Sequence, residues 1–431
     1  MSILIKDTMI VTMDEDRKII DRGYILIEDK IIKEISYGEY LGEFIEKYND
    51  LEVIDGKGYC VMPGLINCHT HAAMTILRGY GEGLPLMRWL NERIWPMESK
   101  FKERHIKLGT EIACMEMIGT GTTCFNNMYF YEEEAIKVAE EFNIRAILGI
   151  PIIGDTWEET LKTALDFHKK VKRRNDNLIK TMLAPHSPYT LEKEALVCVG
   201  KEAKKIESGV HIHIGETEDE VNILKEKYNL TACELLLQSG IFKNKVVGAH
   251  CVHLTDEDIE ILKENKASVV YNPQSNMKLA SGVARIIHML DKGINVCLGT
   301  DGTSSNNNLN MIEEMETGAL LQKLWYKDAT KLDGEEAVKM ATINGAKALG
   351  INNLGIIKEG YLADLIMINL NKPNLIPNHN IHSNIVFSAN GSEVEYVIIN
   401  GKIIMRKAEF LNIDKERIMY EFKALCKEFK Q

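Results

Sequence analysis

The chain has 431 residues, of which 45% are hydrophobic, so it can bury a large core and is too long for one small domain. A net charge of -11 argues against nucleic acid as a partner, because binding a phosphate backbone requires clustered Lys and Arg. No apolar run approaches the roughly 18 residues of a membrane helix, the start lacks a signal-peptide pattern, and nine scattered cysteines without a CxxC pair predict a cytoplasmic protein.

Both ends of the chain have the pattern of short β-strands. Residues 24–35 predict two strands around a tight turn, because β-branched residues stand on either side of it. Residues 361–368 predict a further strand. Asn400-Gly401 lies between two β-branched runs, and this dipeptide suits the two-residue type I′ turn of a hairpin.

The terminal strands predict one domain and the middle of the chain another. We expect residues 1–60 and 361–411 to form a small β-sandwich domain, and residues 412–431 to form an amphipathic closing helix. Residues 61–360 repeat a strand followed by a helix. Buried-type strands are predicted there at 61–68, 122–126, 145–150, 181–185, 210–214, 246–249, 268–272 and 295–299.

The number and rhythm of these strands favour one fold class. Helical patterns lie between most of them, for example at 133–142, 191–206 and 256–265. Eight strands that alternate with helices predict an α/β fold with a closed parallel (β/α)8 barrel of the TIM type, and a doubly wound open sheet is the alternative. In such a barrel, the chemistry lies at the C-terminal ends of the strands.

Three histidines and an aspartate at the ends of predicted strands have the chemistry of a metal site. His69 and His71 are two residues apart on a strand, so their side chains share a face. His213 ends a later strand. Asp301 ends the last one, where a buried carboxylate is costly unless it meets a metal or hydrogen-bond donors, although it could instead cap the next helix.

One divalent cation on these four residues would leave a position for water and lower the pKa of that water towards neutrality. Asp301 can also take the proton of the water, and His250 can orient it. Glu216, in the turn after His213, would then be the acid that protonates the substrate. His211 is in phase with His213 but one layer deeper, and we interpret it as a core histidine. Because no Lys stands in an equivalent position to bridge two metals, we expect one metal.

These residues lie in motifs that resemble the amidohydrolase superfamily, and specifically its adenosine-type deaminases, which act on methylthioadenosine, S-adenosylhomocysteine or 5′-deoxyadenosine. The resemblance covers nearly the whole chain and rests on the motifs at 62–71, 184–189, 213–216, 249–254, 271–279 and 299–306. It implies a β/α barrel with a β-sandwich flank, a single zinc and hydrolytic deamination of an adenine ring. Iron or manganese would also suit three imidazoles and a carboxylate.

The resemblance also implies roles for individual residues. The metal ligands that it implies are His69, His71, His213 and Asp301. It implies that Glu216 shuttles a proton to the purine ring and that His250 lies beside the water. The substrate contacts that it implies are Glu98, His186, Glu216, Asp301 and Ser305. Without the family, we would interpret Glu98 as a surface acid, Ser305 as a helix cap and His186 equally as a structural residue.

One position departs from the family pattern. Family members have an Arg near the end of the third strand, where it meets a polar substrate tail, and Ile150 stands at the matching position here. Arg145 comes too early in that strand and serves its start. Without a guanidinium, a carboxylate-bearing tail binds more weakly, because charge-assisted contacts are the strong ones. We therefore expect 5′-deoxyadenosine-like substrates with a short or apolar 5′ group, with turnover of S-adenosylhomocysteine still open.

Two other functions fit part of the pattern. A guanine-type deaminase or an s-triazine chlorohydrolase would use the same activated water, and Glu98 with residues 186–189 discriminates against both. A catalytically silent scaffold on the same barrel is disfavoured, because every ligand and acid/base position is filled. The expected partner is a small nucleoside, and the family's habit of assembly predicts a homo-oligomer.

Overall fold

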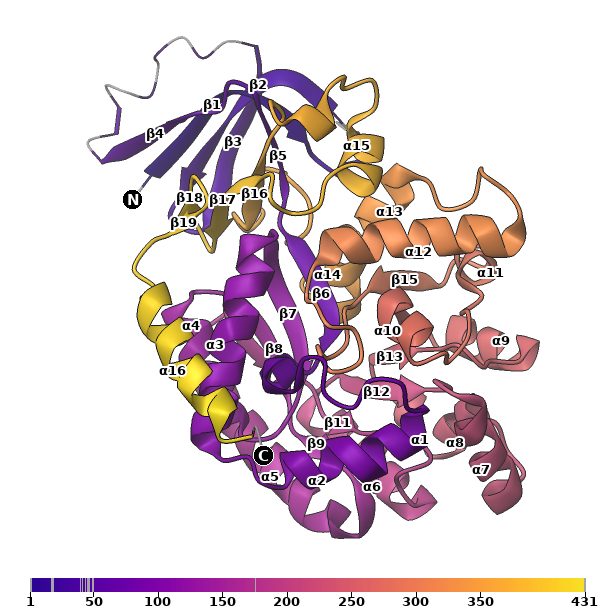
Figure 1. Ribbon diagram of the computed structural model, residues 1–431. Helices are drawn as coiled ribbons and strands as arrows, with labels where there is room; N and C mark the ends of the chain where they lie inside the picture. The colour runs from indigo at the N-terminus through magenta and orange to yellow at the C-terminus, as the bar shows by residue number, and fades with distance from the viewer. Residues whose placement is uncertain are drawn as a thin grey trace.

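Strands from both ends of the chain form one sheet in the computed structural model, which describes residues 2–16, 19–38, 40, 42, 44, 47–48, 50–174 and 176–429 (Figure 1). The strand order is β19-β18-β17-β16-β5-β1-β2-β3, and β4 pairs with β1. The strands are β1 Ser2–Val11, β2 Ile19–Glu28, β3 Ile31–Tyr37, β4 Leu51–Asp55, β5 Tyr59–Pro63, β16 Leu365–Asn369, β17 Val394–Ile399, β18 Lys402–Arg406 and β19 Glu409–Phe410. Hydrogen bonding therefore joins the two termini in one continuous sheet.

The two predicted hairpins are confirmed. β2 and β3 are antiparallel and meet at a turn after Glu28, and β17 and β18 meet at Asn400-Gly401. Asn400 has a φ of 53° and Gly401 a φ of 73°, which is the pair of positive values that a type I′ turn requires. A Cβ on Gly401 would also collide with the carbonyl oxygen of Asp29, so only glycine fits where the two hairpins approach.

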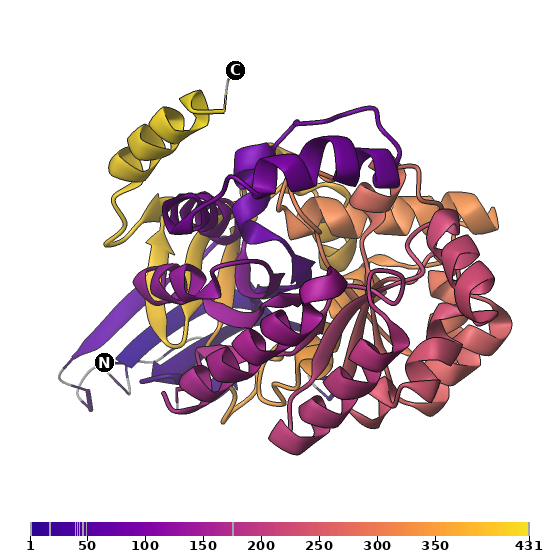
Figure 2. The same cartoon turned by 90° about the horizontal axis from the view of Figure 1, so that it is seen from below.

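The middle of the chain supplies parallel strands, with helices around them (Figure 2). They pair in the orders β10-β8-β7-β6, β11-β9 and β12-β13-β14-β15. A parallel bridge between Leu183 and Val210 joins the segment between β10 and β11 to β12, and the N–H of Asp301 donates to the carbonyl of His69 at 2.9 Å. These strands are β6 Leu65–Thr70, β7 Thr122–Met128, β8 Arg145–Gly149, β9 Pro151–Ile152, β10 Ile179–Thr181, β11 Ala184–Pro185, β12 Val210–Ile214, β13 Val246–His250, β14 Ser268–Tyr271 and β15 Asn295–Leu298.

Three strand predictions were wrong in their bounds. Residues 61–68 do not form one strand. β5 ends at Pro63 in the terminal sheet, and β6 begins at Leu65, so Gly64 is the single residue between them. A Cβ on Gly64 would collide with the side chain of Thr123, so the chain can cross between the sheets only with glycine here. Residues 181–185 split between β10 and β11, which pair with β8 and β9. Residues 361–368 begin a strand only at Leu365, and the preceding Asp364 binds Arg145 through its carboxylate.

The predicted helices at 133–142, 191–206 and 256–265 are confirmed with small shifts, and α16 confirms the closing helix, whose last residues 430–431 lie outside the described part. The helices are α1 Leu86–Trp89, α2 Trp95–Glu98, α3 Glu103–Gly119, α4 Glu132–Glu141, α5 Trp157–Lys172, α6 Lys193–Ile206, α7 Glu218–Tyr228, α8 Ala232–Gln238, α9 Asp256–Glu264, α10 Pro273–Lys278, α11 Ile286–Asp291, α12 Met311–Tyr326, α13 Gly334–Met340, α14 Ile343–Leu349, α15 Ile381–Phe387 and α16 Lys415–Lys427. Among the residues described above, no helix is long and apolar enough to cross a membrane.

Candidate active site

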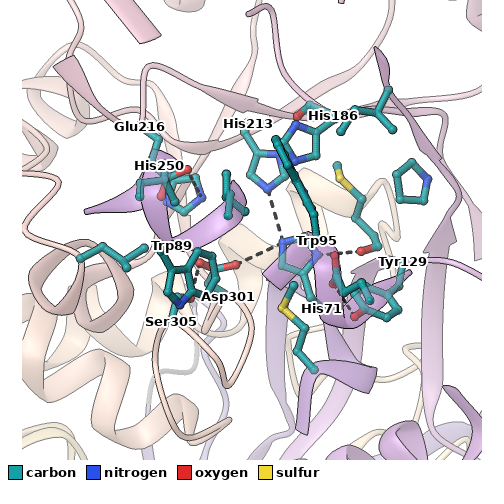
Figure 3. Close-up of a pocket in the computed structure, with 18 of the residues that line it drawn as sticks. His71, Trp89, Trp95, Tyr129, His186, His213, Glu216, His250, Asp301 and Ser305 are labelled. Carbon is teal, nitrogen blue, oxygen red and sulfur yellow. Dashed lines mark hydrogen bonds and ion pairs between the residues drawn. The ribbon is translucent and has the colours of Figure 1, made fainter. Parts of the chain in front are cut away.

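A pocket lies where the parallel strands end, and the side chains that line it come from strands far apart in sequence (Figure 3). β13 contributes its last residue, His250, and the loops after β6, β12 and β15 contribute further side chains. The predicted site residues that line the pocket are His71, Glu98, His186, His213, Glu216, His250, Asp301 and Ser305. His69 is fully buried behind them. The structure therefore brings together the residues that the sequence predicted as metal ligands, acid/base groups and substrate contacts.

The candidate ligand atoms converge at one point. Oδ1 of Asp301 lies 3.3 Å from Nε2 of His69 and 3.2 Å from Nε2 of His71. Nε2 of His213 lies 3.4 Å from Nε2 of His71. One group of donor atoms, from His69, His71 and Asp301, fits within 4.8 Å, and so does a second group, from His69, His213 and His250. Figure 3 shows His71, His213 and Asp301 pointing toward one another.

The hydrogen bonds behind the rings suit a metal. Nδ1 of His71 lies 2.6 Å from the carbonyl oxygen of Met128, and Nδ1 of His213 lies 2.5 Å from that of His186. Because a carbonyl can only accept, each Nδ1 carries the proton and each Nε2 keeps its lone pair for the cluster. Nε2 of His69 is buried and has no hydrogen-bond partner within the described residues. A divalent cation would satisfy that nitrogen, so the residues present fit one.

Asp301 is held by two serines. Its Oδ2 accepts hydrogen bonds from Oγ of Ser275 and Oγ of Ser305, both at 2.7 Å. Burial opposes its ionisation, yet the neighbouring imidazoles of His69 and His71, whose Nε2 atoms lie 3.3 and 3.2 Å from Oδ1, hold the pKa of this carboxyl well below its usual range. The next helix, α12, is instead capped by the side chain of Asn310, so neither Asp301 nor Ser305 caps it.

Glu216 and His250 form a second pair of groups at the pocket. Oε2 of Glu216 lies 3.7 Å from Nε2 of His250, and Nδ2 of Asn276 donates to Nδ1 of His250 at 2.9 Å. Burial raises the pKa of Glu216 well above its usual range, and the neighbouring Asp301 raises it further. Burial lowers the pKa of His250 to about 3. The pair therefore combines a carboxyl whose ionisation is opposed with an imidazole that stays neutral.

Glu98 is a pocket residue, and the interpretation of it as a surface acid was wrong. It ends α2, it is partly buried, and its Oε1 accepts a hydrogen bond from the hydroxyl of Tyr129 at 2.5 Å. Burial raises the pKa of Glu98 to about 7. Nδ1 of His186 lies 3.2 Å from Oγ1 of Thr190. The backbone carbonyl of His186 accepts the hydrogen bond from Nδ1 of His213. His186 is thus both a structural residue and a lining residue.

Sequence reasoning missed several residues that support these side chains. His211 is buried as predicted, but it is more than a core histidine, because its Nε2 lies 2.8 Å from Nδ1 of His69. Its place in phase with His213 was the available signal. Ser275 and Asn276 lie inside the motif at 271–279, where their residue types are hydrogen-bonding ones. Tyr129 gave no signal in the sequence.

Ile150 lies outside this pocket and lines an adjoining one. The two pockets share the side chains of Trp95, Glu98, Phe130 and Ile153, and no Lys or Arg is among the described residues that line the second pocket. Arg145 points elsewhere. Its guanidinium binds the carboxylate of Asp364 at 2.8 and 2.9 Å, at the start of β8, as the sequence indicated.

Residues 60–404 match the model of the amidohydrolase family, so the chain belongs to this family. It is 63% identical over 430 residues to a 5-methylthioadenosine/S-adenosylhomocysteine deaminase of Clostridium tetani, covering 99% of both chains. It is 47% identical over 402 residues to a 5′-deoxyadenosine deaminase of Methanocaldococcus jannaschii, covering 92% of this chain and 94% of the other. A solved adenosine deaminase from Xanthomonas campestris with bound zinc has a TM-score of 0.93 and 30% identity, over 99% of this chain and 98% of the other.

Proposed function

We propose that this protein is a metal-dependent deaminase that hydrolyses the amino group of the adenine ring in 5′-modified adenosines, giving the inosine analogue and ammonia. The observation that carries the proposal is 63% identity over the full length to a deaminase of such nucleosides. Glu216 lies beside the histidine cluster, and its surroundings favour the protonated form of its carboxyl, so it can supply the acid that this reaction needs. His69, His71, His213 and Asp301 are the proposed ligands of one divalent cation, for which zinc is the first choice and iron or manganese are alternatives.

The side chains around the pocket divide the proton transfers between them. When bound, a divalent cation supplies the Lewis acid that makes water a nucleophile near neutral pH. As the water oxygen bonds to C6 of the adenine, Glu216 donates a proton to N1 and Asp301 takes one from the water. As the C6–N bond breaks, Asp301 passes that proton to the 6-amino group, which leaves as ammonia, and the hydroxyl on C6 returns its proton to Glu216 as it becomes the carbonyl of the product. His250 orients the water, and Glu98 and His186 hold the nucleoside.

The proposed fold around this site is a closed (β/α)8 barrel over residues 61–360, flanked by a β-sandwich from residues 1–60 and 361–411. The bridge between Leu183 and Val210 and the hydrogen bond from Asp301 to His69 support closure, because they join strand groups that the ladders leave apart. A cytoplasmic location and a homo-oligomeric assembly complete the proposal. The oligomeric state can be read directly from light scattering of the purified protein.

The adjoining pocket supports a preference for a short or apolar 5′ group. Aromatic side chains of Trp95, Phe101 and Phe130 line it, together with the carboxylates of Glu98 and Glu133. A carboxylate-bearing tail would lose water there and meet no cation, which is unfavourable. The proposed order of substrates is therefore 5′-deoxyadenosine and methylthioadenosine ahead of S-adenosylhomocysteine.

The test is ammonia release by zinc-loaded protein, together with the adenine-to-hypoxanthine absorbance change. The panel is 5′-deoxyadenosine, methylthioadenosine, S-adenosylhomocysteine, adenosine, guanine and an s-triazine chloride. Turnover of the adenine nucleosides alone supports the proposal. Turnover of guanine or the triazine in their place moves the function to the alternative hydrolases of this family, a guanine-type deaminase or a chlorohydrolase.

Ile150→Arg tests the substrate order, and Ile150→Met is its size-matched neutral control. A guanidinium in the adjoining pocket should raise kcat/KM for S-adenosylhomocysteine relative to 5′-deoxyadenosine by about tenfold, as a charge-assisted contact does. A clear preference of the wild type for S-adenosylhomocysteine would contradict the role of Ile150 and leave the deaminase intact.

A further inference from the structure

A second buried carboxyl, that of Glu220, lies directly behind Glu216. Glu220 is 2% exposed, and its Oε2 accepts a hydrogen bond from the backbone N–H of Glu216 at 2.9 Å. The N–H of Gly215 also faces this carboxyl and favours its ionised form. Its other oxygen, Oε1, is buried and lacks a hydrogen-bond partner in the described part of the chain. Glu220 therefore holds the backbone of the turn that carries Glu216.

This arrangement differs from an ordinary helix cap. Glu220 is the third residue of α7, where a glutamate normally accepts the N–H of the N-cap residue. α8 shows that usual form, because Oε2 of Glu234 accepts the N–H of Thr231, its N-cap, at 2.8 Å. In α7 the carboxyl instead reaches past the cap, Thr217, to the residue that lines the pocket. The glutamate at the third position of α7 thus accepts the N–H of Glu216, whereas the one at the third position of α8 accepts the N–H of its N-cap residue.

The charge of Glu220 also acts on Glu216. Burial raises the pKa of Glu220 to about 7, against the lowering effect of the two N–H donors, so its charge changes near neutral pH. When ionised, Glu220 opposes the ionisation of Glu216, which favours the protonated acid. The other titratable groups that face this pair are Tyr189, Cys233, His250, Cys251 and Asp301.

We propose that Glu220 is a positioning residue for the deamination, which fixes the Gly215-Glu216 turn so that the Glu216 carboxyl is aimed at the substrate ring and kept in its acid form. This inference rests on the proposed function, in which Glu216 donates the proton. It assigns Glu220 no contact with the substrate, because Glu220 does not line the pocket. Removing it should therefore affect kcat more than KM.

The test compares two variants of Glu220 with two matched variants of Glu234, the glutamate at the same helix position in α8. Glu220→Gln keeps an oxygen for the N–H groups but removes the charge, and Glu220→Ala removes both. We expect kcat to fall about tenfold in Glu220→Gln and about 100-fold in Glu220→Ala, with KM little changed, since small misplacements of a reacting group have effects of this size. Glu234→Gln and Glu234→Ala should leave kcat unchanged.

The pH profile separates positioning from simple capping. Loss of the negative charge lets Glu216 ionise more readily, so the alkaline limb of kcat/KM should move to lower pH in Glu220→Gln. An active wild type whose Glu220 variants keep its kcat and its pH profile, as the Glu234 variants do, would overturn the inference. A wild type that deaminates no adenine nucleoside would overturn the proposed function itself.

Discussion

Nε2 of His211 lies 2.8 Å from Nδ1 of His69, and both rings are fully buried. His69 is one of the proposed metal ligands, and a partner behind a ligating imidazole fixes its tautomer and its orientation. His211 is therefore placed to set the direction in which Nε2 of His69 points.

His211→Ala should weaken metal binding by about 10- to 100-fold, the range seen when such partners are lost. Competition with a coloured chelator measures this affinity in the variant and in the wild type. His253→Ala is a suitable control, because its Nε2 bonds the carbonyl oxygen of Ser281 outside the cluster. Equal metal affinity in His211→Ala and the wild type would contradict a role for His211.

Glu216→Gln should reduce kcat by about 10²–10⁴-fold, the usual contribution of a general acid. The same variant should raise Tm at neutral pH. Burial holds the folded-state pKa of Glu216 above its unfolded value, so ionisation in the unfolded chain favours unfolding, and the amide removes this effect. Rapid quench and calorimetry give the two quantities. A wild-type kcat in this variant would contradict the role of Glu216 as the general acid.

The pKa of Glu98 predicts a pH dependence of stability. Its folded-state pKa is about 7 and its ordinary value is 4.5, so the folded state binds this proton more tightly. The free energy of unfolding should fall as pH rises from 4.5 to 7, by at most about 3 kcal/mol from this group.

In Glu98→Gln that decline should be smaller than in the wild type, because the contribution of this group is gone, which urea titrations at pH 4.5 and pH 8 would show. Glu92→Gln is the contrasting variant, because hydrogen bonding from Arg88 lowers the pKa of that exposed carboxyl. A decline of equal size in the wild type and in Glu98→Gln would place its cause in another group.

The buried ion pair of Arg145 and Asp364 joins the parallel strands to the terminal sheet. Arg145 is 1% exposed and Asp364 2% exposed, and two hydrogen bonds connect their side chains. Arg145→Met leaves a buried carboxylate without its cation, which should lower the free energy of unfolding by about 3–5 kcal/mol.

Arg174→Met provides the control for that measurement. It breaks a more exposed pair with Asp176 and should cost less than about 1 kcal/mol. The double variant Arg145→Met/Asp364→Leu should be more stable than Arg145→Met alone, because no charge is then left buried. A double variant less stable than the single one would contradict this account.

The sequence predicted the convergence of the site because the residues that converge share one local signal. His69, His213 and Asp301 each end an apolar strand, and the C-terminal ends of parallel strands meet at one edge. The hairpin at Asn400-Gly401 was equally local, since positive φ at two adjacent residues leaves little choice of residue type. The chemical roles of the converging residues stay predictions until the assays above are made.

The supporting contacts could not be predicted, because they join residues whose signals lie far apart. Tyr129 bonds Glu98 across 31 positions, and no periodicity at Tyr129 marks that contact. His211 was predicted to be buried, but burial alone does not show that His69 is the residue that it contacts. The break at Gly64 depends on the side chain of Thr123, which belongs to the neighbouring strand.

The single residue between β5 and β6 has a consequence for the order of folding during synthesis. β5 pairs with β16, whose residues follow roughly 300 positions later, and His69 stands only a few residues beyond β5. As the chain leaves the ribosome from its N-terminus, β5 can pair with β1 at once, but its other edge stays unpaired until nearly the last part of the protein is made. Contacts of such long sequence separation form slowly. We therefore expect nascent chains that end before Leu365 to leave the metal site open.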